Sequence, residues 1–181
     1  RWWRRLVQRK QPGEARWAGN NYPAINVCWA DAIAFCRWLS ARWCLGGTQV
    51  VRLPTDWEWQ WIAQGGASQR RYPWGDDWQS ARANSHESGI GRTIAVGMYP
   101  LGAAAGGVED LAGNVWEWCL NEYDVPGNTR VGGDRPRALR GGSWLDFPGD
   151  LRCGRREAFP PDERDGDIGF RVVLAQPFEP A

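Results

Sequence analysis

The chain has 181 residues, of which 43% are hydrophobic and 24% are charged, and this length and composition suit one globular domain with a substantial core. Its 22 basic and 21 acidic residues give a formal net charge of +1, which argues against a global field that attracts nucleic acid or anionic lipid. The single histidine, His86, argues against histidine-rich zinc sites and against serine–histidine or cysteine–histidine catalytic pairs. Fourteen tryptophans and 23 glycines indicate a loop-rich fold held by aromatic side chains.

The cysteines and the apolar runs give expectations about location. Five cysteines, an odd number, argue against a fully paired secreted framework and favour buried free thiols. No run reaches the ~18 apolar residues of a membrane span, and no stretch has the pattern of a signal peptide. We therefore expect a cytoplasmic protein, or a surface-exposed one if a signal or lipoprotein segment precedes Arg1. Residues 1–181 are expected to form a single domain, the C-terminal part of a longer protein if such a segment exists.

The first periodic segment covers residues 29–40. Ala32, Phe35, Cys36 and Leu39 recur within it at spacings of three and four. This spacing places the four side chains on one face of a helix, because an α-helix repeats every 3.6 residues. The segment is therefore predicted to be an amphipathic helix that packs on the core.

A second helix is predicted at residues 57–64 by its start and stop signals. Thr55 followed three residues later by Glu58 has the pattern of a capping box, and Asp56 favours the positive end of the helix dipole. The two glycines at 65–66 supply the stop signal. This helix is also expected to pack on the core.

The remainder of the chain is rich in turn residues and contains only short strand-like runs. Strands are predicted at residues 49–53, 93–98, 115–120, 138–140 and 168–173. Two long stretches, 72–92 and 121–136, have no periodicity, and we expect buried tryptophan rings or a metal ion to hold them in place. The expected fold class is therefore α+β, with two helices.

Six short phrases occur in a fixed order along the chain: NVCW (26–29), RLPTDWEW (52–59), YPWG (72–75), DLAGNVWEW (110–118), LRGGSW (139–144) and IGFRVV (168–173). Together they resemble the formylglycine-generating enzyme (sulfatase-modifying factor) family, a branch of the C-type lectin fold. The resemblance covers residues 23–173 and implies short antiparallel strands and long irregular loops around the two helices. Seven tryptophans in or beside the phrases are expected to be core anchors, namely Trp29, Trp57, Trp59, Trp74, Trp116, Trp118 and Trp144.

The family's chemistry does not transfer with the phrases. The resemblance implies a copper-binding cysteine pair shortly after the Gly-Gly-Ser-aromatic phrase, yet residues 145–153 contain only Cys153. One thiol cannot supply the two thiolate ligands of a soft Cu(I) ion. Iron-dependent relatives use three histidines, which His86 alone cannot provide. We therefore expect a non-catalytic protein without copper or iron, the alternative being a family domain with a structural role or a different oxidative chemistry.

A structural calcium ion is implied by the family's DLAGNVWEW phrase. Its ligands would be the side chains of Asp110 and Glu117 and the backbone carbonyls of Gly113 and Val115. Carboxylates and carbonyls are the hard oxygen ligands that calcium prefers. The alternative is that the two carboxylates cap a turn and pair with an arginine, for instance Arg140 or Arg171.

Between Trp144 and Ile168 the sequence follows no hydrophobic period and resembles the variable region of proteins diversified by bacterial retroelements. This narrower resemblance implies a rigid scaffold whose variable region, about 144–168, displays a diversified binding face. The residues expected to bind ligand are Trp144, Leu145, Asp146, Phe147, Asp150, Arg155, Glu157, Ala158, Phe159, Pro160, Glu163, Asp165 and Gly166.

The partner expected for this face is a protein or another macromolecule. Exposed Leu145, Phe147 and Phe159 beside charged residues would form an amphipathic contact patch. Nucleic acid is not expected, because acidic and basic residues nearly balance between 130 and 171. The alternative is an ordinary pair of irregular loops in an inactive family member, and the oligomeric state is left open.

Overall fold

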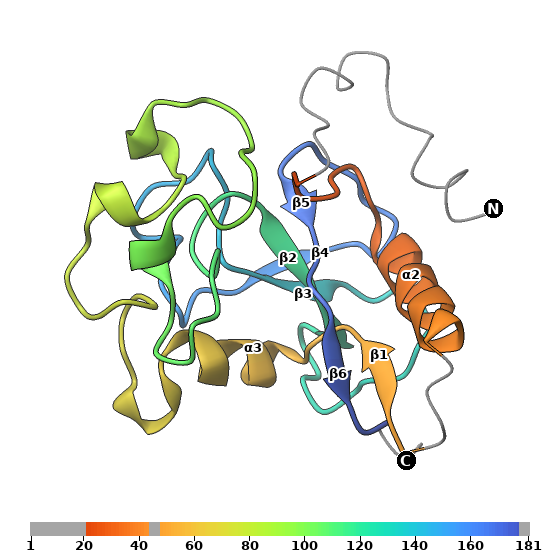
Figure 1. Cartoon of the computed structure of the whole chain (residues 1–181). Helices are drawn as coiled ribbons and strands as arrows, with labels where there is room; N and C mark the ends of the chain where they lie inside the picture. The colour runs from red at the N-terminus through yellow and green to blue at the C-terminus, as the bar shows by residue number, and fades with distance from the viewer. Residues whose placement is uncertain (1–20, 44–47, 178–181) are drawn as a thin grey trace.

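The computed structural model describes residues 21–43 and 48–177, so Cys44 lies outside the described residues. Two α-helices, four short 3-10 turns and six strands follow one another in these residues (Figure 1). In chain order they are α2 (Trp29–Arg42), β1 (Val50–Arg52), α3 (Asp56–Ala63), η2 (Gly66–Ser68), η3 (Ser80–Arg82), η4 (His86–Ser88), η5 (Pro100–Gly102), β2 (Trp116–Glu122), β3 (Arg137–Arg140), β4 (Glu157–Phe159), β5 (Ile168–Gly169) and β6 (Val173–Ala175).

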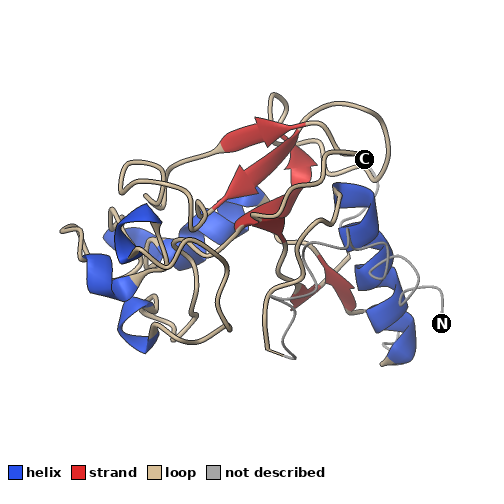
Figure 2. Ribbon diagram, turned by 90° about the horizontal axis from the view of Figure 1, so that it is seen from above, coloured by secondary structure: helices blue, strands red, loops and turns tan. Residues whose placement is uncertain are grey.

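The strands form two small sheets. The larger has the order β4-β3-β2-β5, in which β2 pairs antiparallel with β3, β3 antiparallel with β4, and β2 parallel with β5. The smaller joins β1 to β6 antiparallel. Figure 2 shows α2 on one side of the strands and the short helical turns of residues 66–102 on the other. The expected α+β class is confirmed.

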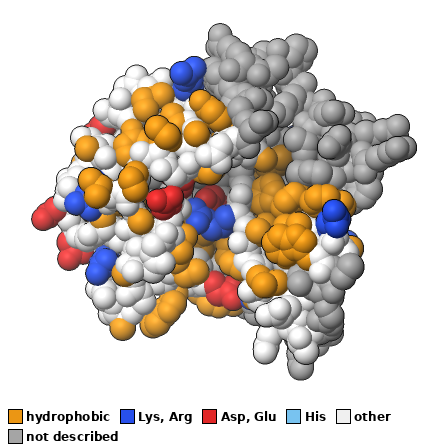
Figure 3. All heavy atoms as spheres, in the orientation of Figure 1, with side chains coloured by type: hydrophobic (Ala, Val, Ile, Leu, Met, Phe, Trp, Pro, Cys, Tyr) orange, Lys and Arg blue, Asp and Glu red, His pale blue; other side chains and the backbone are white. Residues whose placement is uncertain are grey.

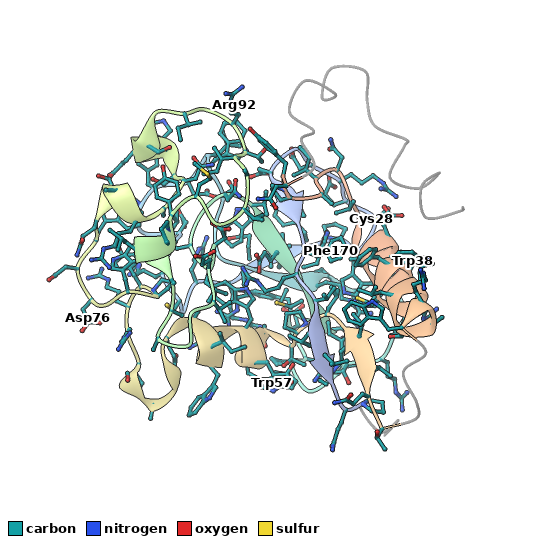
Figure 4. The ribbon with its side chains drawn as sticks, viewed as in Figure 1. Cys28, Trp38, Trp57, Asp76, Arg92 and Phe170 are labelled. Atoms are coloured by element: carbon teal, nitrogen blue, oxygen red, sulfur yellow. The ribbon has the colours of Figure 1, made fainter. Side chains whose placement is uncertain are left out.

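Helix α2 matches the helix predicted at 29–40 and extends it to Arg42. Ala32 and Cys36 are buried, while Phe35 and Leu39 are half-buried on the same side. The ring of Phe35 meets the ring of Phe170 edge-on at 5.4 Å, and Figure 4 shows Phe170 beside this helix. Of the helices in the described part, none has the length and apolar content to cross a bilayer.

Helix α3 begins with the predicted capping box. The Glu58 backbone N–H donates to Thr55 Oγ1 at 3.3 Å, and the Thr55 backbone N–H donates to Glu58 Oε2 at 2.9 Å. Asp56, the first helical residue, is buried against Arg156 at 2.6 Å. The Asp56 carboxylate therefore forms a buried ion pair and also lies at the positive end of the α3 dipole.

The core contains most of the predicted tryptophan anchors. Trp29, Trp59, Trp116 and Trp118 are buried, and each of the indoles of Trp29 and Trp118 donates to a backbone carbonyl. Trp57 does not follow the prediction, because 43% of its surface is exposed and it points outward from α3 (Figure 4). The buried residues of this helix are Asp56, Trp59 and Ala63.

The long stretch at 72–92 is held by aromatic contacts, as expected. The rings of Tyr72 and Trp74 stack at 5.5 Å, and Trp78 lies 5.2 Å from Tyr72 and 5.6 Å from Trp74. These rings pack against a small buried cluster that includes Leu151. The stretch therefore reaches a fixed conformation with two 3-10 turns, η3 and η4, as its regular structure.

One strand prediction is wrong and another is right only in part. Residues 93–98 form no strand, because the Ile94 N–H bonds to the Asn114 side chain and the Gly97 N–H to Asp110 Oδ2 instead of to a neighbouring strand. The run at 168–173 is divided between β5, which pairs with β2, and β6, which starts at Val173 and pairs with β1.

Candidate functional site

The candidate site begins where the chain leaves β3 through Gly141 and Gly142. Both glycines have positive φ, +97° and +72°. A Cβ atom at Gly141 would lie 3.2 Å from the Trp59 ring, and one at Gly142 would lie 3.1 Å from the Leu151 side chain. Because L-residues rarely adopt these angles and a side chain would be crowded at both positions, glycine is required where the chain enters the segment after β3.

The first turn of the variable region presents two apolar side chains to solvent. Leu145 is 48% and Phe147 is 55% exposed, although the Phe147 ring also contacts the His86 ring at 4.3 Å. Between them, Asp146 Oδ2 accepts hydrogen bonds of 2.7 Å from both the N–H and the hydroxyl of Ser143. Asp146 therefore shapes the turn, while its two neighbours are free to contact a partner.

Trp144 itself is half-buried rather than displayed. Its backbone N–H donates to the Asn114 carbonyl at 3.2 Å. Its indole nitrogen is buried and has no hydrogen-bond partner among the described residues. Trp144 thus belongs mainly to the support of the turn.

A network of charges follows in the next part of the region. Arg155 bonds to Asp150 at 3.0 Å and to Glu157 at 2.6 Å, and all three side chains are more than a third exposed. Exposed ion pairs of this kind contribute little stability, because water screens them. The three predicted residues therefore lie together on the surface and can exchange partners with a ligand.

Strand β4, which the sequence patterns did not reveal, carries three of the predicted residues. Glu157, Ala158 and Phe159 pair with Leu139, Ala138 and Arg137 of β3. Phe159 is partly buried and packs against the core cluster. Its expected role as an exposed anchor is therefore wrong.

The last part of the region is tied to the start of α2. The Asn26 N–H donates to the Asp165 carbonyl at 2.9 Å, and Arg164 forms an ion pair with Asp31. Pro160 and Glu163 form a turn closed by a backbone bond of 3.1 Å, and both are exposed. Exposed side chains therefore sit on a backbone held at both ends.

Asp167, which follows the predicted Asp165 and Gly166 in the same non-periodic segment, is partly buried. Burial raises the pKa of Asp167, a hydrogen bond from Ser143 lowers it, and the charges of Asp165 and Asp146 raise it further. The Asp167 carbonyl accepts from the Trp116 N–H at 2.8 Å, which ties this run to β2. Gly166, between Asp165 and Asp167 in the chain, is half-buried and donates its N–H to Asp165 Oδ1 at 2.5 Å.

The predicted calcium ligands surround a cavity of about 360 Å³, which we name the Glu117 pocket; it is lined by Glu109, Asp110, Gly113, Val115, Glu117 and Arg171, among others. Arg171 Nε lies 2.5 Å and its Nη2 2.8 Å from the two oxygens of Glu117. Trp59 donates a further bond of 2.7 Å to the same carboxylate. The expected alternative, pairing with Arg171, is thus observed at Glu117.

Two of the other three proposed calcium ligands, the Asp110 carboxylate and the Gly113 carbonyl, also have partners. Asp110 Oδ2 accepts from the Gly97 N–H at 2.7 Å, the Gly113 carbonyl accepts from the Val115 N–H at 2.9 Å, and the Asp110 carbonyl accepts from Arg171 at 2.9 Å. Within residues 21–43 and 48–177 no group of three or more His, Cys, Asp or Glu side chains is arranged to hold a metal ion. The oxygens of Glu117 do not fit calcium in this arrangement, because a cation already faces them.

Cys153, the cysteine in the stretch after Ser143, is 1% exposed. Burial raises the pKa of its thiol to about 12, although the nearby Arg140 and Arg70 act in the opposite direction. A thiol is a nucleophile or metal ligand in its thiolate form, which is scarce at neutral pH under these conditions. Cys153 thus has the environment of a structural cysteine.

These features define the class to which the molecule belongs: an α+β protein with the C-type lectin fold, of the kind found in formylglycine-generating enzymes and in variable proteins. The sequence model of the sulfatase-modifying factor enzyme 1-like domain matches residues 3–176. The chain therefore belongs to this family, and the resemblance seen in the six phrases is confirmed.

Relatives in the family include both active and inactive members. The chain is 34% identical over 178 residues to the formylglycine-generating enzyme of Streptomyces coelicolor, with 84% of this chain and 52% of the enzyme covered. It is 31% identical over 167 residues to the inactive C-alpha-formylglycine-generating enzyme 2 of Bos taurus, with 84% of this chain and 50% of that protein covered. The chain thus spans about half the length of these relatives.

Among solved structures, Treponema denticola variable protein 1 superposes with a TM-score of 0.78. The two chains are 24% identical, and the superposition covers 97% of this chain and 80% of the other. At this level of identity the likeness establishes the shared fold.

Proposed function

We propose that this protein binds ligands without catalysis and displays a diversified surface, residues 144–166, on a rigid C-type lectin scaffold, as a variable protein of a diversity-generating retroelement. The observation that carries the proposal is the contrast at the first turn. Leu145 and Phe147 are about half exposed, while Ser143 before them is fully buried. Apolar side chains held outward by a fixed backbone suit binding, because little ordering entropy is lost.

The absence of turnover is part of the proposal. It is supported by the burial and raised pKa of the Cys153 thiol and by the ion pair between Glu117 and Arg171. The second candidate is a family domain with a structural role or another oxidative chemistry. The 34% identity to the Streptomyces coelicolor enzyme favours that candidate.

The first experiment changes Leu145 and Phe147 together to alanine. We expect the melting temperature to stay within about 3 °C, because partly exposed side chains contribute little to the core. Leu151→Ala is the matched control: Leu151 is fully buried, so its truncation should cost about 3 kcal/mol. A large loss of stability in the Leu145/Phe147 variant would place these residues in the core and contradict the proposal.

A display library tests binding directly. Randomising Leu145, Phe147, Asp150, Glu163 and Asp165 should give mostly folded variants, from which binders to an arbitrary test protein such as lysozyme can be selected. A library randomised at Gly141 and Gly142 should be mostly unfolded. Failure of the first library to fold or to yield binders would sink the proposal, while copper or iron binding with oxygen uptake on a thiol peptide would support the second candidate.

A further inference from the structure

A second hollow, of about 790 Å³, lies between the end of α3 and the turn at 149–155. We name it the arginine pocket; Gln60, Gln64, Arg70, Arg71, Arg152 and Arg155 line it. No aspartate or glutamate from the described ranges is among its lining residues. A cavity of this size matches the pockets of organic ligands rather than of single inorganic ions.

Most of the positive charge in the arginine pocket is uncompensated. Arg155 is neutralised by its two carboxylate partners, Asp150 and Glu157. Arg70, Arg71 and Arg152 form no ion pair with any carboxylate in the part of the chain that the structure describes. The pocket therefore carries about three positive charges that an anion can meet.

Asp76, an acidic residue on the 70–77 loop, bonds to the backbone of Arg71 and not to its guanidinium group. Asp76 Oδ1 accepts from the Arg71 N–H at 2.9 Å and so shapes the loop. Figure 4 shows Asp76 at the outer edge of the molecule. The guanidinium of Arg71, which lies 6.0 Å from the Tyr72 ring centre, is left for other partners.

Gln60 and Gln64 add amide N–H donors whose orientation is set by a chain of hydrogen bonds. Arg140 donates to Gln60 Oε1 at 2.8 Å, Gln60 Nε2 to Gln64 Oε1 at 3.1 Å, and Gln64 Nε2 to the Gly66 carbonyl at 2.9 Å. Because arginine can only donate, it fixes which end of each amide carries the oxygen. Each amide nitrogen then keeps a second N–H for an acceptor placed in the pocket.

The two segments that carry the arginines are held together before any ligand binds. The Cys153 N–H donates to the Arg71 carbonyl at 2.9 Å. Arg152 Nε donates to the Gly149 carbonyl at 2.8 Å, and the Arg155 N–H to the Arg152 carbonyl at 2.9 Å. The guanidinium groups therefore start from an ordered backbone, which reduces the entropy lost on binding.

We propose that the arginine pocket binds an acidic segment of the protein ligand through several of its carboxylates. Planar guanidinium groups recognise carboxylates by paired hydrogen bonds, and the size of the pocket suits several residues of a peptide. The inference rests on the proposed function, because Arg152 and Arg155 belong to the same region as the display surface. It adds to that function a preference for ligands that carry carboxylates next to the part of the surface that contains Arg155.

The test measures the binding of fluorescein-labelled hexaglutamate by anisotropy at low salt. We expect wild type to bind it, and the Arg71→Gln/Arg152→Gln variant to bind at least tenfold more weakly, because two of the three uncompensated charges are gone. Labelled hexaglutamine is the uncharged match and should not bind. Arg92→Gln is the control variant, since Arg92 is an exposed arginine at the opposite end of the molecule from α3 (Figure 4).

Three outcomes would overturn the inference: no hexaglutamate binding by wild type, equal binding by all variants, or loss of binding in Arg92→Gln as well. Tighter binding of pyrophosphate than of hexaglutamate, with the same dependence on Arg71 and Arg152, would also overturn it and would indicate a small-anion site. The melting temperature of each variant verifies folding. Selection of binders from the Leu145/Phe147 library is independent of these results, so the proposed function can stand where this inference fails.

Discussion

The Glu117 pocket and the arginine pocket both contain arginine, but they differ in where the opposite charge comes from. In the Glu117 pocket, Arg171 is met by a carboxylate and by two backbone carbonyls of the same chain. In the arginine pocket, Arg71 and Arg152 have no such carboxylate within the described residues. On the face seen in Figure 3, a basic side chain lies directly beside acidic ones near the centre, whereas others, at the top and at the right, have no acidic neighbour on that face.

This difference teaches how the same residue type can serve stability or binding. Burial alone lowers the pKa of Arg171, but the charge of Glu117 and the hydrogen bonds to it raise that pKa above its ordinary value. The pair is thus a permanent ion pair that closes the fold around β2 and β5. An arginine with no internal partner gives little to the fold and remains available to a ligand.

The largest expected effect comes from breaking the internal pair. Arg171→Met leaves Glu117, whose side chain is 7% exposed, as a buried unpaired charge. We expect a loss of about 3 kcal/mol, which corresponds to roughly 10 °C in melting temperature for a domain of this size. Arg152→Met in the arginine pocket is the matched control and should change the melting temperature by less than about 2 °C. Equal effects of the two variants would remove the distinction between the pockets.

A smaller effect is expected at Arg52 and Glu58, which form an ion pair within the chain that is partly exposed to solvent. Burial raises the pKa of Glu58, but hydrogen bonds from Arg52 and Thr55 outweigh it and lower the pKa to about 2. Because the folded-state pKa is depressed, the stabilisation is present above pH ~4.5 and is lost as the pH falls towards 2. We expect Glu58→Gln to cost about 1 kcal/mol at pH 7, a value reduced by solvent screening, and less at pH 3.

Urea unfolding of both proteins at pH 7 and pH 3 measures this difference. Glu163→Gln, at an exposed glutamate that forms no ion pair in the described ranges, is the control variant and should change the stability at pH 7 by less than about 0.5 kcal/mol. A cost for Glu58→Gln that grows on acidification would contradict the assignment, since the sign of the linkage would be reversed.

The smallest effect is expected from metal removal. Since Arg171 supplies the positive charge at Glu117, EDTA should leave the melting temperature unchanged within about 1 °C. Calcium at Asp110 and Glu117 remains a prediction of the family resemblance. A fall of several degrees with EDTA, reversed by calcium, would establish that prediction and would make the Glu117 pocket a metal site.

The parts of the fold that the sequence predicted are those in which local signals and the core agree. The capping box at Thr55 and the apolar spacing of α2 act within a few residues, so the pattern contains the cause. The positive φ angles of Gly141 and Gly142 agree with the two consecutive glycines of the LRGGSW phrase. The exposure of Leu145 and Phe147 agrees with the expected binding face.

The parts that could not be predicted depend on distant partners. Ile94 and Gly97 have strand-like surroundings in sequence, yet side chains of Asn114 and Asp110 take their backbone hydrogen bonds. Phe159 follows no period, but pairing of β4 with β3 turns it towards the core. The arginine pocket combines the end of α3 with the turn at 149–155, which lies far along the chain and shares no local sequence pattern with the helix.

The pairing of β1 with β6 has a consequence for synthesis of the protein. Its strands are far apart in the chain, and Arg52 bonds to the Gln176 carbonyl across 124 positions. A ribosome delivers β6 after every other described strand, so β1 has no strand partner until then. Contacts of such large sequence separation form slowly, so we expect this sheet to be among the last parts of the fold to assemble.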